Sequence, residues 1–581
     1  MEEQAGSGHS DFNVSFADIR LAHGQQITLP KPGVTVFVGP NNVGKSTVLK
    51  QMNALSVQGF SGQSFPGAPV LVEGMELQIT GGAHDAQSWI EKHSRSRRGT
   101  TPRRFYRPGG GEITLDQVPH QLSSGKYGRG LNTLQPFVVY FGDPWNRISS
   151  VGPVEMRDSF EDPPAHPIHT LQDDAAIFEE LNDLCMQVFK RQLTLDTLSK
   201  GVNIRIGSPS ADAPRLDRIT SEYRESLSAL PRLEYQGDGM RSFIGLMLPL
   251  ITNSYHVVLI DEPEAFLHPP QAAQLGKILG QLAKEKSMQI VVATHDKNFL
   301  SGLLLSDAEI SIVRLDRPAS NELTAHQLSV ANLKRIWEDP VLRHTNVLDG
   351  LFHKLTVLAE GDRDCTFFSA ALEHLSTQEE LHFSPSDVLF VPSGGKGGLR
   401  LLIEVLSSAH VPIVASPDLD ILDDKAFLKR LISSLNGNWE DFEKDYDQAT
   451  LPFRQPRDKF PVSVILNSLN EVFKDRQSEI FDSGTAEEFR ALLRSKESPW
   501  KALKDYGETA WNRKPAAATA AANLLAKLDN LGIVAVRVGE LEGFAPTLEV
   551  KKGPEWVPAA ITAGYHLQPP AQNHLRRILG L

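Results

Sequence analysis

Near its start the chain carries the residue types and spacing of a phosphate-binding loop. Residues 39–46 (Gly-Pro-Asn-Asn-Val-Gly-Lys-Ser) match the pattern G-x4-G-K-[ST]. The apolar run 34–38 before them predicts a buried strand, and residues 47–55 predict a helix whose N-terminal N–H groups converge on phosphates. The expected nucleotide-binding residues are Gly39, Asn41, Asn42, Gly44, Lys45, Ser46 and Thr47. Among them, Lys45 suits the β- and γ-phosphates, and the Ser46 hydroxyl suits Mg²⁺.

Two later apolar runs end in residues that suit nucleotide hydrolysis. The run 257–260 ends in Asp261 and Glu262, and the run 289–293 leads to Thr294 and His295. Asp261 suits the Mg²⁺ shell, Glu262 suits polarising the attacking water, and His295 suits contact with the γ-phosphate. Taken alone, each is also typical of a surface residue after a strand. Because α/β sheets bind ligands at the carboxyl ends of their strands, the three together with the phosphate loop predict one site.

A second group of acids follows strands in the later part of the chain. After the runs 355–359, 411–415 and 533–538 stand Glu360, Asp364, Asp418, Asp420, Glu540 and Glu542. Another strand, 388–391, leads into the glycine-rich stretch 393–398, which completes a βαβαβ pattern. Carboxylates gathered at one sheet edge are hard oxygen ligands for a divalent cation. The competing interpretation is a solvated acidic rim, which each acid alone favours and the six together do not.

Composition sets limits on the environment and partners. The 581 residues carry a formal net charge of −12, which gives no general attraction to nucleic acid. The arginine-rich stretch 92–107, with Phe105 and Tyr106, is either a local nucleic-acid patch or a solvated loop. Two cysteines fit a reducing compartment, the first ten residues are polar, and no apolar run is long enough for a membrane span. We therefore expect a cytoplasmic protein without membrane contact.

The alternation of strands and helices predicts an α/β protein of two domains. The expected boundaries are 1–345, with a mostly helical insertion at about 165–232, and 351–581, with a helical insertion at about 424–530. Strands are also expected at 75–80 and 136–141.

The order phosphate loop, Asp-Glu strand, then strand-Thr-His resembles ABC-type ATPases. The candidate for that family's signature loop is residues 236–242, where Gly237 and Gly239 are expected to contact the nucleotide of a partner subunit and Asp238 replaces the usual serine. The loop after the Asp-Glu strand, residues 262–269, is similar to the loop that the OLD (overcoming lysogenization defect) family has at this place. The resemblance implies ATP as the nucleotide and a homodimer or higher oligomer formed through the ATPase domain. Asp238, which departs from the family's pattern, implies slow, switch-like hydrolysis instead of fast turnover.

The second half resembles the Toprim nuclease domain of the OLD family. The matching motifs are Glu360-x3-Asp364, Ser416-x-Asp418-x-Asp420 and the late acidic motif 539–543, with Lys551 or, as first choice, Lys552 as the family's downstream lysine. The resemblance implies two Mg²⁺ or Mn²⁺ ions, the first held by Glu360, Asp418 and Asp420 and the second by Asp364 with Glu540 or Glu542. Catalytic roles then fall to Glu262, His295, Glu360, Asp418, Asp420 and Lys552.

The expected function is an ATP-regulated, metal-dependent nuclease acting on DNA or RNA, in anti-phage defence and beside a second defence protein or RNA. The alternative is an ATP-gated scaffold or sensor that controls a separate effector. A topoisomerase or primase also uses Toprim chemistry, but the chain has no plausible tyrosine module or zinc-binding element for it. An ABC transporter subunit is a weaker alternative still, because transport gives no role to the carboxylates of the second half of the chain.

Overall fold

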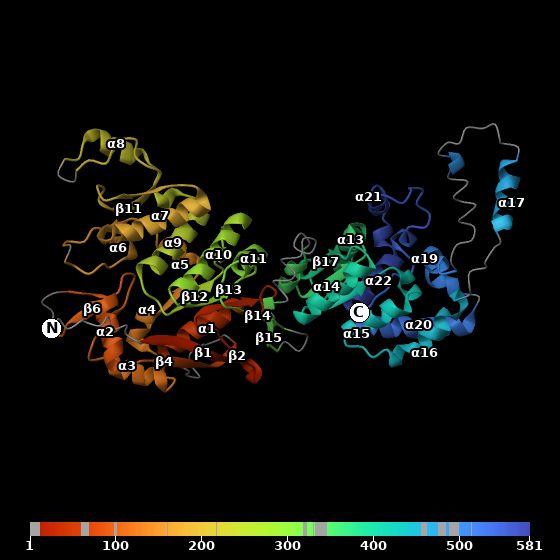
Figure 1. The fold of residues 1–581 in the computed structure, drawn as a ribbon, viewed down its shortest axis with the longest axis horizontal. Coiled ribbons are helices and arrows are strands. Elements are labelled where there is room, and N and C mark those ends of the chain that lie inside the picture. The colour runs from red at the N-terminus through yellow and green to blue at the C-terminus, as the bar shows by residue number, and fades with distance from the viewer. Residues whose placement is uncertain are drawn as a thin grey trace. The chain divides into compact units, whose positions relative to one another are not determined.

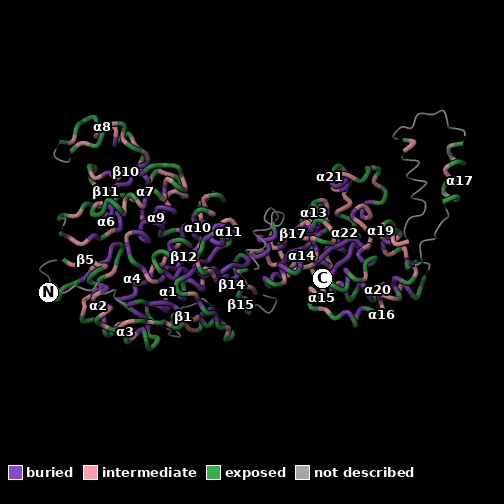
Figure 2. The backbone as a smooth tube through the Cα atoms, in the orientation of Figure 1, coloured by how far each residue is buried: buried purple, intermediate pink, exposed green. Residues whose placement is uncertain are grey.

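The computed structural model describes residues 12–59, 69–97, 101–159, 161–215, 218–317, 322–328, 330–331, 346–454, 462–474, 484–486, 499–512 and 514–581. The chain forms two compact units, Met1–Asp339 and Pro340–Leu581 (Figure 1). Both combine parallel strands with helices, so the predicted α/β class is confirmed. Buried residues follow the sheets of each unit (Figure 2). Within the described residues, no helix has the length and apolar character needed to cross a bilayer.

The first unit is built on a six-stranded sheet in the order β15-β14-β3-β13-β12-β8. Its strands are β3 (Gly33–Val38), β8 (Val139–Gly142), β12 (Val257–Asp261), β13 (Gln289–Ala293), β14 (Ile310–Asp316) and β15 (Thr324–Leu328). All neighbours are parallel except β14 and β15. Every residue of β3, β12 and β13 is buried, as expected for a parallel sheet covered on both faces. Helix α1 (Lys45–Gln58) lies on one side, and α10 (Pro269–Glu285) and α11 (Lys297–Leu304) on the other (Figure 1).

An antiparallel sheet, β2-β1-β4, packs beside this one. It consists of β1 (Asn13–Leu21), β2 (Gln26–Thr28) and β4 (Val72–Thr80). The buried Gln289 side chain joins the two sheets: its Oε1 accepts from the Phe16 N–H at 2.8 Å, and its Nε2 donates to the carbonyls of Phe16 (2.8 Å) and Pro30 (3.1 Å). Helices α2 (Ala83–His93) and α3 (Val118–Lys126) and the small sheet β5 (Arg95–Ser96), β6 (Arg104–Tyr106) and β7 (Glu112–Thr114) follow.

Two predictions for the first unit were wrong in part. The stretch 165–232 contains helices α6 (Pro167–Asp173), α7 (Ala175–Phe189) and α8 (Ser221–Ala229), but also β10 (Leu193–Asp196) and β11 (Gly201–Ile206), which form a sheet with β9 (Val154–Glu155). The predicted strand 136–141 begins as the short helix α4 (Gln135–Val138), because Pro136 favours the first turn of a helix, and only then continues as β8.

The second unit is built on the parallel sheet β17-β16-β18. Its strands are β16 (Leu355–Ala359), β17 (Val388–Pro392) and β18 (Ile413–Ser416), and helices α13 (Asp362–Gln378), α14 (Lys396–Ser408), α21 (Trp556–Thr562) and α22 (Pro569–Leu579) surround it. The aromatic side chains of Phe367, Phe544 and Trp556 meet in its core, with Phe367 stacked on Phe544 at 5.4 Å.

The last predicted strand, 533–538, is not a regular strand. It forms two isolated bridges, one from Ile533 to Ala415 in β18 and one from Val536 to Asp418 just after β18. The described parts of 424–530 are helical: α15 (Lys425–Ser434), α16 (Glu440–Thr450), α17 (Val462–Phe473), α19 (Lys501–Tyr506) and α20 (Pro515–Leu531).

Candidate functional site

The phosphate loop of the first unit runs from the end of β3 into α1. Gly39 has a φ of +143°, and a Cβ at this position would lie 2.3 Å from the Leu315 carbonyl oxygen. Gly44, with a φ of +112°, caps the N-terminus of α1. Asn41 and Asn42 are exposed, and Ser46 and Thr47 lie half-buried in the first turn of α1. The loop thus has the backbone shape that its glycines predicted, with free N–H groups at a helix N-terminus that suit an anion.

Lys45 lies buried beneath this loop. Its Nζ donates to the carbonyl oxygens of Gly39 (2.8 Å) and Pro40 (2.9 Å). Burial lowers the pKa of Lys45 to about 8, although the carboxylates of Glu262, Glu264 and Asp261 oppose the shift. A partly desolvated ammonium beside free loop amides is suited to holding phosphate oxygens.

Asp261 ends β12 and Glu262 follows it. In the sheet, β13 lies between β12 and β3 and pairs with both. The buried Arg147 of α5 (Pro144–Ser149) donates to the carbonyl oxygens of Asp261 (3.0 Å) and Glu262 (2.7 Å), and Glu262 has a φ of +45°. Burial raises the pKa of Asp261, against the effect of a hydrogen bond from Ser46. Asp261 Oδ1 is buried without a hydrogen-bond partner among the described residues. A carboxylate oxygen without a hydrogen-bond partner, close to Ser46, is suited to bind Mg²⁺.

His295 faces two glutamates. Its Nδ1 lies 3.5 Å from Glu262 Oε1 and 3.4 Å from Glu264 Oε1. A hydrogen bond with Glu262 raises the pKa of His295 and lowers that of Glu262. Glu264 is fully enclosed and accepts from Thr294 Oγ1 (2.7 Å) and the His295 N–H (3.1 Å); burial raises its pKa to about 7. Glu264 was not among the predicted site residues, and it is what fixes the His295 backbone beside Glu262.

The candidate signature loop begins helix α9 (Asp238–Thr252), with Gly237 as its N-cap. A Cβ on Gly239 would lie 2.5 Å from the Phe266 carbonyl oxygen, so this glycine packs against the loop that follows Glu262. Gly237 has open space around it. Asp238 pairs with Arg241 at 2.9 Å, which offsets the charge that this acid brings to the loop.

The arginine-rich stretch is mostly paired with acids or buried. Arg104 pairs with Glu112, Arg103 lies near Glu91 and over Phe105, and Arg97 lies 3.6 Å from Asp162. Arg107 is buried with its guanidinium 3.8 Å from the Tyr255 ring centroid. Arg98 lies outside the described residues. These contacts speak against a nucleic-acid patch. The strands β5, β6 and β7 and the buried Arg107 also differ from the solvated loop that the sequence allowed as the alternative.

The second unit brings the predicted acids together at the carboxyl ends of β16 and β18. Glu360 follows β16, and Asp418 and Asp420 follow β18, which pairs directly with β16. Glu360 and Asp418 line the same cavity. Glu540 and Glu542 join them because the Val536 and Gly539 backbones hydrogen-bond to Pro417 and Leu419 (both 2.9 Å). We call these residues the carboxylate site: Glu360, Asp364, Asp418, Asp420, Glu540 and Glu542.

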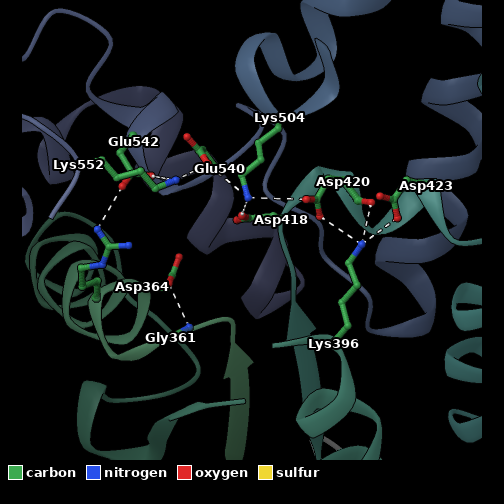
Figure 3. Close-up of polar contacts among 11 residues, drawn as sticks. Gly361, Asp364, Lys396, Asp418, Asp420, Asp423, Lys504, Glu540, Glu542 and Lys552 are labelled. Atoms are coloured by element: carbon green, nitrogen blue, oxygen red, sulfur yellow. Dashed lines mark hydrogen bonds and ion pairs between the residues drawn. The ribbon is translucent and has the colours of Figure 1, made fainter. Parts of the chain in front are cut away.

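A lysine that was not predicted lies among these acids (Figure 3). Lys504 Nζ is 3.4 Å from Asp418 Oδ2, 3.6 Å from Asp420 Oδ2 and 3.5 Å from Glu540 Oε2. Burial lowers the pKa of Lys504, but the surrounding carboxylates outweigh it and raise the pKa overall. Lys504 belongs to α19, in the helical insertion, where no sequence motif marks it.

Other cations hold the outer acids. Lys552 Nζ lies 2.6 Å from Glu540 Oε2 and 3.4 Å from Glu542 Oε2, so the predicted lysine does reach the carboxylate site (Figure 3). Arg363 Nη1 is 3.2 Å from Glu542 Oε1. Lys396, from the glycine-rich stretch, pairs with Asp423 (2.8 Å) and lies 3.6 Å from Asp420 Oδ1.

Asp364 and Asp418 carry the strongest signs of electrostatic crowding. Burial, and then the charge of Glu360, raise the pKa of Asp418. Burial raises the pKa of Asp364 to about 6, although the Gly361 N–H donates to its Oδ2 at 3.1 Å. Both line a cavity of about 420 Å³ with Glu360, Glu542, Lys504 and Lys552. Excess negative charge in a partly enclosed space is a property of cation sites.

The donor set fits hard divalent cations, since carboxylate oxygens from several segments converge and an ammonium already lies among three of them. Among the described residues, no three acidic, histidine or cysteine side chains already stand in metal-ligating geometry. Ser416, part of the predicted motif, takes no part: its buried Oγ hydrogen-bonds to His574 Nε2 at 2.9 Å.

Comparison with known proteins gives two matches in sequence. Residues 135–301 match the family model described as "AAA domain", whose description also names the AbiEii toxin and a "Type IV TA system". This stretch contains Arg147, Asp261, Glu262 and His295. An OLD nuclease from Thermus scotoductus is 28% identical over 235 residues, which are 39% of this chain and 43% of that protein. The match thus spans less than half the length of that relative.

Solved structures show distant similarity. The SMC head domain from Thermotoga maritima has 13% identity and a TM-score of 0.28, covering 55% of this chain and 99% of that chain. The protein cbiO1 from Clostridium perfringens, part of an ABC transporter complex, has 12% identity and a TM-score of 0.30, covering 58% and 95%. The two sequence matches agree with the resemblance that the motifs predicted: residues 135–301 are similar to an AAA domain, and 235 residues of the chain are similar to an OLD nuclease.

Proposed function

We propose that this chain is an ATP-regulated, divalent-metal-dependent nuclease that hydrolyses phosphodiester bonds of DNA or RNA. The observation that carries the proposal is the carboxylate site, in which acids from two strand ends and the segment 540–542 converge on one edge of the β17-β16-β18 sheet. A solvated acidic rim would spread such charges apart; here Glu360 and Asp418 line one cavity, and burial together with the charge of Glu360 raises the pKa of Asp418.

In the proposed chemistry, Glu360, Asp418 and Asp420, with Asp364, Glu540 and Glu542, hold Mg²⁺ or Mn²⁺. When bound, such ions activate water and stabilise the charge of a phosphodiester in its transition state. Lys552 contributes positive charge at the edge of the cavity, where it can contact a substrate phosphate. Asp364, with its pKa near 6, is ionised at neutral pH and available as a ligand.

The first unit supplies the proposed control by ATP. Lys45 and the loop amides hold the phosphates, Ser46 and Asp261 hold Mg²⁺, and Glu262 with His295 orients the attacking water at the γ-phosphate. The open space at Gly237 lets a second copy of the chain place its nucleotide there, so we propose a homodimer or higher oligomer. A cytoplasmic location, a role in anti-phage defence, and a second protein or RNA partner are further parts of the proposal, supported by the resemblance to the OLD family.

The test is incubation of the full chain with labelled plasmid DNA, tRNA and single strands, with Mg²⁺ or Mn²⁺ and with or without ATP. We expect cleavage of at least one substrate, lost in the Asp418→Ala/Asp420→Ala protein, which still binds ATP. The matched control is Lys45→Ala, which loses ATP binding but keeps the metal site. Equal cleavage by the wild type and the double variant refutes the assignment.

One observation favours the alternative, an ATP-gated scaffold or sensor. Lys504, Lys552 and Arg363 already neutralise much of the carboxylate site. A chain whose acids serve only as structural ion pairs takes up no Mn²⁺ at that site. Calorimetry with Mn²⁺ on the nucleotide-free protein separates the two functions, because only the nuclease binds the ion there.

A further inference from the structure

Lys504 holds three acids of the carboxylate site together. Its ammonium lies within 3.6 Å of one oxygen each of Asp418, Asp420 and Glu540. These oxygens come from the end of β18 and from the segment after residue 538, so one cation joins two parts of the chain (Figure 3). A position bounded by three carboxylate oxygens is one that a divalent cation would otherwise take.

Backbone contacts fix α19 in this place. A Cβ on Gly539 would lie 2.1 Å from the Lys504 carbonyl oxygen, and a Cβ on Gly507 would lie 2.3 Å from the Arg537 carbonyl oxygen. Both glycines have positive φ, +106° and +56°, and the Glu508 N–H donates to the Arg537 carbonyl at 2.9 Å. The helix that carries Lys504 is therefore packed backbone to backbone against the segment that carries Glu540.

Glu360, Asp364 and Glu542, the acids of the carboxylate site that Lys504 does not contact, differ in their ion pairs. Among the described residues, no lysine or arginine forms an ion pair with Glu360 or Asp364, whereas Glu542 pairs with Arg363 and Lys552. Glu360, Asp364 and Asp418 line the cavity of about 420 Å³, together with Arg363, Lys504 and Lys552. This part of the site has the space for an added ion and, in Glu360 and Asp364, two acids that form no ion pair with a lysine or arginine among the described residues.

We propose that Lys504 is a built-in cation of the carboxylate site, which fills the position among Asp418, Asp420 and Glu540 and leaves room for one divalent ion at Glu360, Asp364 and Asp418. The inference rests on the proposed metal-dependent function. It changes the count of two ions that the family resemblance implies, and it makes Asp420 and Glu540 partners of Lys504 in place of ligands of an ion. Lys504 is a positioning residue here: it sets how many ions the acids take up.

The experiment counts Mn²⁺ ions bound per nucleotide-free full chain by equilibrium dialysis and metal analysis. The Asp418→Ala/Asp420→Ala protein gives the background of all other sites. The variants are Lys504→Met, which removes the charge, Lys504→Arg, which keeps it, and Lys501→Met, a lysine of the same helix that lies near Asp505 instead. Lys504→Gln repeats the count if the methionine variant does not fold.

We expect one ion above background for the wild type, Lys501→Met and Lys504→Arg, and two for Lys504→Met. Equal counts in the wild type and Lys504→Met, whether one or two, overturn the inference and leave the metal-dependent function standing. A count at background in every protein overturns both, because then no cation binds at the carboxylate site.

Discussion

Glu360 and Asp418 follow the neighbouring strands β16 and β18 and line one cavity, where the charge of Glu360 acts on the buried carboxyl group of Asp418. Burial and the charge of Glu360 raise the pKa of Asp418, so the folded chain keeps a proton at a pH where the unfolded chain has lost it. The free energy of unfolding therefore falls as the pH rises above the ordinary aspartate pKa toward the raised value in the fold.

Asp418→Asn should remove this penalty. Without metal, we expect the variant to be more stable than the wild type at pH 9 by about 1 kcal/mol or more, since each unit of pKa shift corresponds to about 1.4 kcal/mol, and to differ less at pH 5. Thermal unfolding in EDTA across this pH range measures the effect. An equal pH dependence for both proteins would show that Asp418 is not the titrating group.

ATP binding should take up protons through Lys45. With a pKa of about 8, Lys45 is only partly charged in the free protein at pH 8.5, and bound phosphates restore its proton. We expect an uptake of about three quarters of a proton at pH 8.5 and almost none at pH 6.5. Calorimetry in buffers of different ionisation enthalpy gives the number. Lys45→Arg, which does not titrate here, is the control and should show no uptake at either pH.

Arg147 should support both the fold and hydrolysis of ATP. It is the buried donor to the Asp261 and Glu262 carbonyls, so Arg147→Met leaves these groups unsatisfied and frees Glu262 from its positive φ. We expect a loss of about 2–4 kcal/mol in unfolding free energy and at least about a tenfold fall in ATP turnover per folded molecule. Arg205→Met, which removes another buried arginine paired with Asp196, should cost stability without changing turnover. Similar turnover losses in both would contradict the specific role.

Gly539→Ala should disturb the contact between α19 and the acidic segment. The added Cβ would meet the Lys504 carbonyl at 2.1 Å, in a backbone conformation with a φ of +106°. We expect a destabilisation of about 2–3 kcal/mol, measured by denaturant unfolding, and altered Mn²⁺ affinity. Gly397→Ala, in α14 with open space around it, should be neutral or slightly stabilising because alanine favours helices.

Local patterns were enough to predict the phosphate loop and most strand-terminal acids. The strand before Gly39, the Asp261–Glu262 pair and the acids after β16 and β18 are each marked by an apolar run followed by a turn. In a parallel sheet, the carboxyl ends of adjacent strands meet, so convergence of Glu360 with Asp418 followed from topology alone.

What the sequence did not reveal depends on contacts between distant segments. Lys504 lies on a short helix of polar pattern, and only its packing against Gly539 brings it to Asp418. The strands β10 and β11 were not predicted, although Val202, Ile204 and Ile206 alternate with other residues as in a strand. The apolar periodicity of the preceding α7 is strongly helical, and the whole stretch was therefore predicted as mostly helical. Arg107 read as a surface charge and proves buried against Tyr255.

The bridges from Ile533 to β18 and from Val536 to Asp418, just after that strand, have a consequence for shortened versions of the chain. They cover the outer side of the last strand of the sheet with backbone from a segment more than a hundred residues later. A fragment ending before residue 533 would leave the amide and carbonyl groups on this side of β18 unpaired and exposed. Exposed edge strands of this kind pair with other chains and cause aggregation. Solubility of the second unit therefore depends on the same stretch of polypeptide that delivers its last two acids.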